Sequence, residues 1–348
     1  MDPLTHLVSG AVSGHAANGG REGQPGVRGL SIFCALAAAS PDIDILVGSD
    51  PVINLTLRRG VTHSVFGTLV MALIFAVVGR KIWPRAKFMW LYGLTLAMLW
   101  LHIFFDLINS YGVQILAPLS NHRFALDAIF IIDPLLTFPV LACVIGAAIS
   151  TSWRRRFGII GVAWCLGWPT LAIVTRQILQ AKIAGDMAGE LKDGEEVIVS
   201  SDAFSPVRWK IVTRTPTQIR IEGYDIFSGL SGKPSSWYTR ADLGELQAFG
   251  RFHRIFPVYA WFAQYPVRLE RMEEARGREI EWRDLRFASM VDWVRELREP
   301  GPNADKALTR SPFTVVAFLD AHGELLKWGW ASGSGVLRVM DPPLASSP

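Results

Sequence analysis

Histidines and aspartates recur at the ends of the apolar segments in the first half of the chain. His102 and Asp106 are four residues apart, a spacing that places both side chains on one face of a helix, about one turn apart. Asp42 and Asp44, in the segment Ser-Pro-Asp-Ile-Asp, form a second carboxylate pair at a loop or helix end. Imidazole nitrogens combined with carboxylate oxygens favour Zn²⁺, with Mn²⁺ as the alternative. The pattern therefore predicts a divalent-metal site.

The predicted metal ligands are His6, Asp42, Asp44, His63, His102 and Asp106. Six ligands exceed the need of a single ion, so the prediction covers one to three ions. Such sites activate water and stabilise the attacking and leaving oxygens in phosphoester hydrolysis. The structural alternatives are a helix cap for the Pro-Asp-x-Asp turn and an intrahelical hydrogen bond between His102 and Asp106.

Four residues are predicted to take part in catalysis. Asp42 or Asp44 would serve as a ligand or as the general base. Arg59 and Arg123 would hold phosphate oxygens, because a guanidinium group matches phosphate bidentately. The alternative for the arginines is a position at the membrane edge, with the charged head in water.

The elements that must position these residues are apolar runs. Half of the 348 residues are hydrophobic by type, only 19% are charged, and mean hydropathy is +0.26. Most runs approach the 17–25 residues that cross a bilayer as a helix. They are Leu30–Val47, Ser64–Gly79, Phe88–Ile108, Ile129–Ile149 and Phe157–Gln177, with Leu4–Ala17 as a weaker sixth. Five such runs are too many for a soluble core, so we predict an integral membrane bundle of about five to six helices.

Basic residues in the loops predict the orientation of this bundle. If the segments alternate, the three loops of one side hold nine Lys and Arg residues, and the loops of the other side hold three. The richer side is predicted to be cytoplasmic. The candidate ligands then all lie at the opposite face, which in a bacterial inner membrane is periplasmic. The pI near 9.0 is accounted for by these boundary residues, without any basic stripe that would indicate nucleic-acid binding.

The composition of the chain changes near residue 180, where charged residues become more frequent. Residues 1–178 carry 21 of the 66 charged residues, and the remainder of the chain carries 45. Short alternating segments separated by turn signals predict a β-rich extramembrane domain over residues 179–340. Within it, Arg251–Glu273 and Arg278–Phe287 are predicted as paired strands and Ala288–Arg298 as a helix. Residues 341–348 are predicted to be a disordered tail.

The motifs of the first 140 residues, in order, resemble those of the YdjM/DUF457 family of bacterial inner-membrane proteins, described as membrane-bound metal-dependent hydrolases. They are Asp2-Pro-Leu-Thr-His6, Ser-Pro-Asp42-Ile-Asp44, Arg59-Gly-Val-Thr-His63-Ser64, His102-Ile-Phe-Phe-Asp106, Asn109-Ser-Tyr-Gly112, Arg123-Phe-Ala-Leu-Asp127 and Phe-Ile-Ile-Asp133-Pro134. That family is in turn similar to the zinc-dependent phospholipase C and P1 nuclease group. The resemblance implies that the six predicted ligands hold zinc, although the terminal Trp ligand of the soluble enzymes is missing here.

The resulting hypothesis is a membrane-bound, metal-dependent hydrolase that cleaves a phosphoester of a lipid or lipid-linked molecule. Its partners would be the bilayer and that substrate, with no nucleic acid. A non-catalytic metal-binding scaffold or partner-binding protein is the main alternative, and a transporter is a third. The clustering of the acids at one face, away from the membrane midplane, speaks against transport.

Overall fold

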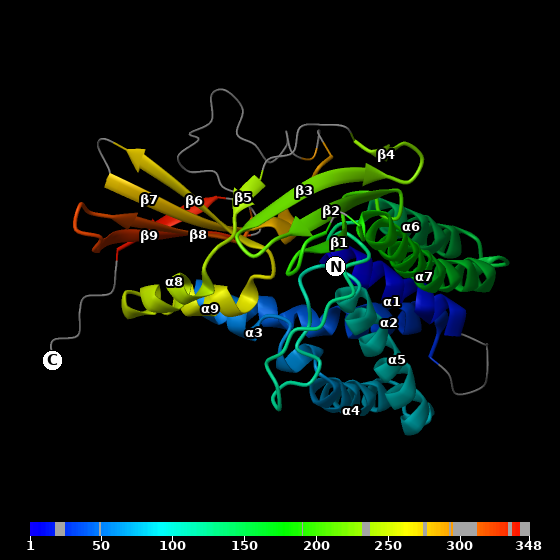
Figure 1. Cartoon of the computed structure of the whole chain (residues 1–348). Helices are drawn as coiled ribbons and strands as arrows, with labels where there is room; N and C mark the ends of the chain where they lie inside the picture. Colours follow the sequence, from blue (N-terminus) through cyan, green and yellow to red (C-terminus); the bar gives the residue numbers. More distant parts are fainter. Residues whose placement is uncertain are drawn as a thin grey trace. The chain divides into compact units, whose positions relative to one another are not determined.

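The computed structural model describes residues 1–17, 25–48, 50–189, 191–231, 237–273, 277–291, 294, 312–332 and 336–341. The chain divides into two compact units (Figure 1). The first comprises residues 1–48, 57–177 and 203–206, and the second comprises residues 49–56, 178–202 and 207–348. Helices make up the first unit, and most strands lie in the second.

The first unit is built from apolar helices. They are α1 (Pro3–Ala17), α2 (Val27–Ala39), the 3-10 helices η1 (Ser40–Val47) and η2 (Val61–His63), α4 (Val65–Ile82), α5 (Phe88–Leu107), α6 (Pro134–Ile149) and α7 (Arg154–Met187). Helix α3 (Pro51–Leu57) begins in the second unit. Four described segments are long and apolar enough to cross a membrane: Val27–Leu46, Val65–Ile82, Phe88–Leu107 and Arg154–Met187. The prediction of an α-helical membrane bundle followed by a β-rich region is confirmed.

Local sequence signals set where these helices begin and end. After α2 the chain tightens into η1, whose second residue is Pro41, so the Asp42 and Asp44 segment leaves the helix as a compact turn. Ser64 caps α4 by accepting a hydrogen bond from the Gly67 amide at 3.0 Å. Asp133 caps α6, with Pro134 at the first helical position. The predicted run Ile129–Ile149 is therefore helical only from Pro134, over 16 residues.

Helices α1 and α2 approach each other closely through two glycines one turn apart. A Cβ atom at Gly10 would lie 2.3 Å from the Cys34 carbonyl oxygen, and one at Gly14 would lie 2.5 Å from Ser31 Cα. Small residues at this spacing permit backbone contact between membrane helices. The contact fixes the start of α1, which carries His6, relative to α2.

The second unit contains two antiparallel sheets. One has the order β1 (Glu196–Ser201), β2 (Arg208–Arg214), β3 (Gln218–Asp225), β4 (Gly229–Leu230), and β5 (Trp237–Thr239) also pairs with β3. The other has the order β10 (Leu337–Met340), β9 (Leu325–Ala331), β8 (Thr314–Leu319), β7 (Gly277–Asp284), β6 (Pro266–Glu273). The short helices α8 (Leu243–Ala248), η3 (Phe249–Arg251), α9 (Ile255–Phe262) and η4 (Leu285–Phe287) accompany them.

One predicted hairpin differs from the structure in its first half. The predicted strand Arg251–Glu273 contains α9 at Ile255–Phe262, and strand β6 begins only at Pro266. Pro257 explains part of the difference, because proline fits the first turn of a helix but cannot donate to a strand ladder. The second predicted strand ends at Asp284 and continues as η4.

Two further predictions fall mainly outside the described residues. Of the predicted helix, residues 288–291 are not helical, Val294 is helical, and residues 292, 293 and 295–298 lie outside the described part of the chain. The predicted tail likewise lies outside it from residue 342 onward. Helix α7 continues to Met187, beyond the predicted domain boundary at residue 178.

Candidate metal centre

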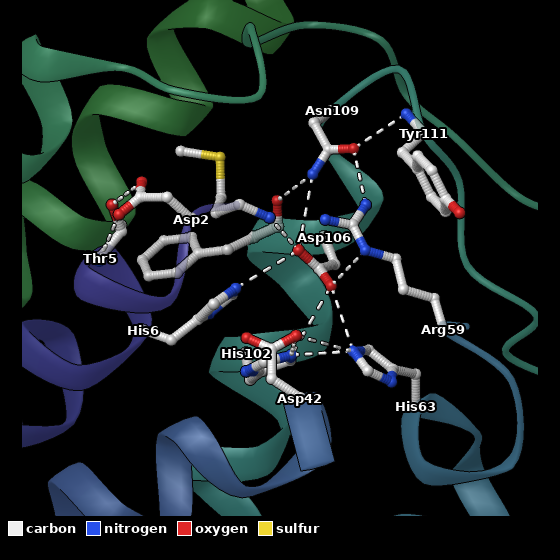
Figure 2. A network of polar contacts seen from close by, with 12 residues as sticks. Asp2, Thr5, His6, Asp42, Arg59, His63, His102, Asp106, Asn109 and Tyr111 are labelled. Carbon is white, nitrogen blue, oxygen red and sulfur yellow. Dashed lines mark hydrogen bonds and ion pairs between the residues drawn. The ribbon is translucent and has the colours of Figure 1, made fainter. Parts of the chain in front are cut away.

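Four helix ends bring the candidate ligands together. His6 lies in the first turn of α1, Asp42 lies in η1 after α2, His63 ends η2 before α4, and His102 and Asp106 occupy the last turns of α5. Figure 2 shows these side chains converging on the Asp106 carboxylate. Segments far apart in sequence thus contribute to one buried cluster.

The core of the cluster is formed by Asp42, His63, His102 and Asp106, each of which offers one ligand atom within 4.8 Å of the others. Asp106 Oδ2 lies 3.2 Å from His63 Nε2 and 3.6 Å from His102 Nε2. Asp42 Oδ1 lies 3.8 and 3.9 Å from the same two nitrogens. Only Asp42 among the four has measurable exposure, with 15% of its side chain accessible. Access to the cluster therefore comes from the Asp42 side.

Acceptors behind the two imidazoles favour one tautomer of each ring. His102 Nδ1 lies 2.6 Å from the Ala38 carbonyl oxygen, which can only accept, so this nitrogen carries the hydrogen. His63 Nδ1 lies 3.2 Å from Asp44 Oδ2, another acceptor. In their neutral forms both rings therefore present a bare Nε2, and these two atoms are only 3.0 Å apart. Two lone pairs at this distance repel each other unless a proton or a metal ion lies between or beside them.

The remaining donor atoms fit the same conclusion. Within the described residues, Asp42 Oδ2 and Asp44 Oδ1 are buried and accept no hydrogen bond, which is uncommon for buried carboxylate oxygens. Burial opposes protonation of His63, but hydrogen bonds to Asp106 and Asp44 outweigh it and raise the pKa of this imidazole. The site thus stabilises added positive charge. A mixed nitrogen and oxygen donor set of this kind suits a divalent metal ion.

Two of the six predicted ligands lie beside this four-residue core. Asp44 contacts His63 Nδ1, and its Oδ2 also accepts a hydrogen bond from the Arg59 amide at 2.7 Å. His6 stacks on His102 with ring centroids 3.6 Å apart, and its Nε2 lies 3.3 Å from Asp106 Oδ1. The amino group of Met1 contacts the same carboxylate oxygen. Asp44 is therefore placed to orient a ligand, whereas His6 faces the opposite oxygen of Asp106.

Arg59 is placed within the cluster by an unusual backbone conformation. Its φ of 53° lies in the left-handed region, which non-glycine residues adopt rarely. Its Nε lies 2.8 Å from Asp106 Oδ2, and its Nη1 donates to Asn109 Oδ1 at 2.9 Å. Figure 2 shows this side chain reaching across to both residues. The guanidinium group thus offsets the charge of the same Asp106 oxygen that His63 and His102 contact.

Arg123 is placed elsewhere. Its Nη1 donates to the Gly112 carbonyl at 3.2 Å and its Nη2 donates to the Arg58 carbonyl at 2.9 Å. Its guanidinium group also lies 5.2 Å from the ring centroid of Tyr111, over which Arg59 lies at 4.8 Å. These contacts join the loop after α5 to the segment that carries Arg59. No described contact of Arg123 reaches the four core ligands.

Three contributors were not singled out from the sequence. The Ala38 carbonyl carries no sequence signal, because any residue provides that group. Thr62 Oγ1 lies 3.0 Å from His63 Nδ1 and 3.3 Å from Asp44 Oδ2, and Tyr111 provides the aromatic surface for the arginines. Both residues stand inside the quoted motifs, so only their position next to a predicted ligand pointed to them.

Comparison of the sequence with known proteins shows the family to which the chain belongs. The chain is 29% identical over 221 residues to the uncharacterized protein YfhP of Bacillus subtilis (strain 168), an alignment that covers 62% of this chain. The chain spans 65% of the length of that relative. No solved structure matches the chain. The family model described as YdjM inner membrane protein matches residues 1–181, which include every candidate ligand. The chain therefore belongs to the YdjM family of inner membrane proteins.

Proposed function

We propose that this protein is a membrane-bound, metal-dependent hydrolase that cleaves a phosphoester of a lipid or lipid-linked substrate. The observation that carries the proposal is the pair of inward-facing imidazole Nε2 atoms, 3.0 Å apart beside the Asp42 and Asp106 carboxylates. His63, His102, Asp106 and Asp42 would hold the ion, most simply Zn²⁺. When bound, the ion supplies Lewis acidity that activates water and stabilises charge on phosphoryl oxygens.

The remaining residues would position this site. The Ala38 carbonyl and Asp44 hold the two imidazoles in the required tautomers, as outer partners of metal-bound histidines commonly do. Asp42 combines partial exposure with an oxygen that accepts no hydrogen bond among the described residues, so it is the candidate to take a proton from water. Arg59 would act as a positioning residue for Asp106. Its Nε and Nη1 contact Asp106 and Asn109, and the phosphate contact expected from the sequence stays a prediction.

The depth of the site supports a lipid substrate. Helix α5 has 20 residues, enough to span the hydrocarbon core of about 30 Å. His102 and Asp106 occupy its last two turns, so they would lie near the edge of that core, where lipid phosphates reside. A water-soluble phosphoester would need no site at this depth.

Metal analysis of the purified protein, paired with a phosphoester screen that includes phospholipids, tests the proposal. His63→Ala is expected to lose the bound metal and the activity while the protein stays in the membrane. His15→Ala is the matched control, because His15 is a buried histidine of α1 that has no described contact with the cluster. Full metal content in the His63 variant would refute the site assignment. Metal retention without hydrolysis of any substrate would favour the scaffold alternative.

The proposed orientation places the site and the second unit on the periplasmic side. A cysteine introduced at His322, an exposed turn residue in the second unit, should react with a membrane-impermeant thiol reagent in intact cells. A cysteine at Ser152, exposed in the loop between α6 and α7, should react only after lysis. The reverse labelling pattern would invert the orientation without affecting the metal site.

A further inference from the structure

Helices α4 and α5 of the first unit have an apolar groove between them. The two helices pack against each other and are joined by residues 83–87 (Figure 1). The groove has a volume of about 430 Å³ and is lined by Leu69, Val70, Leu73, Phe88, Met89 and Tyr92. Val70 and Met89 are exposed, and both helices are long and apolar enough to cross a membrane. In a bilayer the groove therefore opens toward the acyl chains.

Exposed cations lie at one end of this groove. They are Arg80, Lys81, Arg85 and Lys87. Two lining residues, Phe88 and Met89, directly follow Lys87 at the start of α5. No acidic residue occurs in the sequence between Asp50 and Asp106, and none of these cations forms an ion pair with another described residue. This end of the groove therefore carries positive charge that the described part of the chain does not compensate.

The loop that carries the cations is held in a defined conformation. The Ala86 amide donates to the Trp83 carbonyl at 3.0 Å, and Ala86 is buried in the core of the helical unit. The Trp83 ring packs edge-on against Phe33, with ring centroids 5.5 Å apart. These contacts fix the backbone on both sides of Arg85 and close to Lys87. Only the side chains of these two residues need to move to meet an anion.

The groove has the length that an acyl chain requires. Leu69 lies roughly 20 Å along α4 from the end of that helix at Ile82. A hydrocarbon core of about 30 Å gives each leaflet roughly 15 Å. A lipid whose phosphate lies at the basic loop can therefore lay one chain along the groove. Basic pockets between membrane helices are typical binding sites for anionic headgroups.

We propose that the groove and its basic loop bind one anionic phospholipid, with an acyl chain along the groove and the phosphate group held by Arg85 and Lys87. A water-soluble anion would gain nothing from the apolar lining. A second copy of this chain, packed symmetrically at the same place, would bring two sets of like charges together. An anionic lipid matches both the apolar lining and the cations. Such binding does not depend on hydrolase activity.

Photo-crosslinking of the full-length protein in phosphatidylcholine vesicles tests the site. The vesicles contain a trace of phosphatidylglycerol or, in parallel, of phosphatidylcholine, each with a photoactivatable group in its acyl chain. Mass spectrometry maps the adducts. The phosphatidylglycerol probe is expected to label the groove at least fivefold more than the phosphatidylcholine probe does, because each cation near the surface favours an anionic lipid. Equal labelling by the two probes would overturn the proposal.

A pair of double variants tests the headgroup contact. Arg85→Gln with Lys87→Gln should lower the labelling ratio of the two probes at least threefold. Arg155→Gln with Arg156→Gln is the matched control, because these exposed cations lie in the first turn of α7 and on the same predicted side of the membrane. The control should keep the ratio of the unsubstituted protein. An equal loss in both double variants would indicate a general effect of surface charge and would overturn the proposal.

A second pair of variants tests the groove itself. Val70→Trp fills the groove without changing a cation, and it should remove at least half of the phosphatidylglycerol adducts there. Val78→Trp is the control, because Val78 is an exposed valine of the same helix that does not line the groove. Adducts spread evenly over the exposed faces of α4, α5 and α7 would indicate ordinary bilayer contact and would overturn the proposal. A groove without adducts would mean that a protein segment covers it, which would also overturn the proposal.

Discussion

Two carboxylates, one in each unit, are used in opposite ways. In the helical unit, Asp106 is fully buried and contacts Arg59, His6, His63 and His102 at once. In the β-rich unit, Glu270 is partly exposed and pairs with Arg268 and Arg278 across the sheet surface. The same carboxylate chemistry thus serves a concentrated site in one unit and a solvated surface in the other. The difference shows that burial and the number of partners, and not residue type, separate these two carboxylates.

The largest difference between the units should appear when one carboxylate is removed from each. Asp106→Ala leaves the buried Arg59 guanidinium without its carboxylate, which costs about 3–5 kcal/mol for a buried pair, and it should abolish bound metal. Glu270→Ala should change the free energy of unfolding by less than about 1 kcal/mol. Thermal unfolding in detergent and metal analysis measure both effects. Similar losses of stability in the two variants would contradict the comparison.

A smaller effect is expected when an orienting carboxylate is changed within the helical unit. Asp44→Asn should lower metal affinity by roughly 10–100-fold, because outer partners of metal-bound histidines typically contribute this much. Chelator competition measures the affinity. Asp127→Asn is the matched control, since both aspartates are 7% exposed and Asp127 accepts a hydrogen bond from Ser110 outside the cluster. An equal loss of metal affinity in the two variants would contradict a specific role of Asp44.

The β-rich unit also contains a buried charge. Lys210 is fully buried, and its Nζ donates to the Arg286 carbonyl at 2.6 Å and the Ala288 carbonyl at 2.8 Å. Lys210→Met keeps the volume but leaves two carbonyls unsatisfied, so it should destabilise the protein by about 1–3 kcal/mol. Metal content should stay unchanged. A loss of metal in this variant would mean that the two units do not act separately.

The smallest effect concerns pH. Hydrogen bonds from Arg278 and Arg268 lower the pKa of Glu270 below its ordinary value of 4.5. A lowered pKa in the folded state means that the stabilisation is present above pH 4.5 and is lost as the pH falls through the folded value. Because this pair is exposed, the loss should stay below about 1 kcal/mol. Titration of the Glu270 side-chain carbon by NMR checks the shift, and Arg278→Gln should move it back toward 4.5.

Much of the fold was predictable from local patterns. The apolar runs, the loss of hydropathy near residue 180 and the alternation of Glu196–Ser201 reflect short-range requirements of helices and strands. Prediction failed where a local apolar run is compatible with either element, as in the segment that forms α9. It also overestimated the run at Ile129–Ile149, whose first residues lie before the Asp133 cap.

The residue types of the candidate metal site were determined by the sequence alone, because carboxylates and histidines at the ends of apolar helices need a specific reason to be there. Only the tertiary structure decided which of these residues lie in the four-residue core and which lie beside it. Residue type does not distinguish Asp42 from Asp44, yet one faces two bare imidazole nitrogens and the other lies behind His63. Likewise, the sequence identified Arg59 and Arg123 as equivalent cations, and only the left-handed turn at Arg59 directs one of them to Asp106. The physical reason is that ligation depends on ångström-scale contacts between helix ends, which local sequence patterns do not encode.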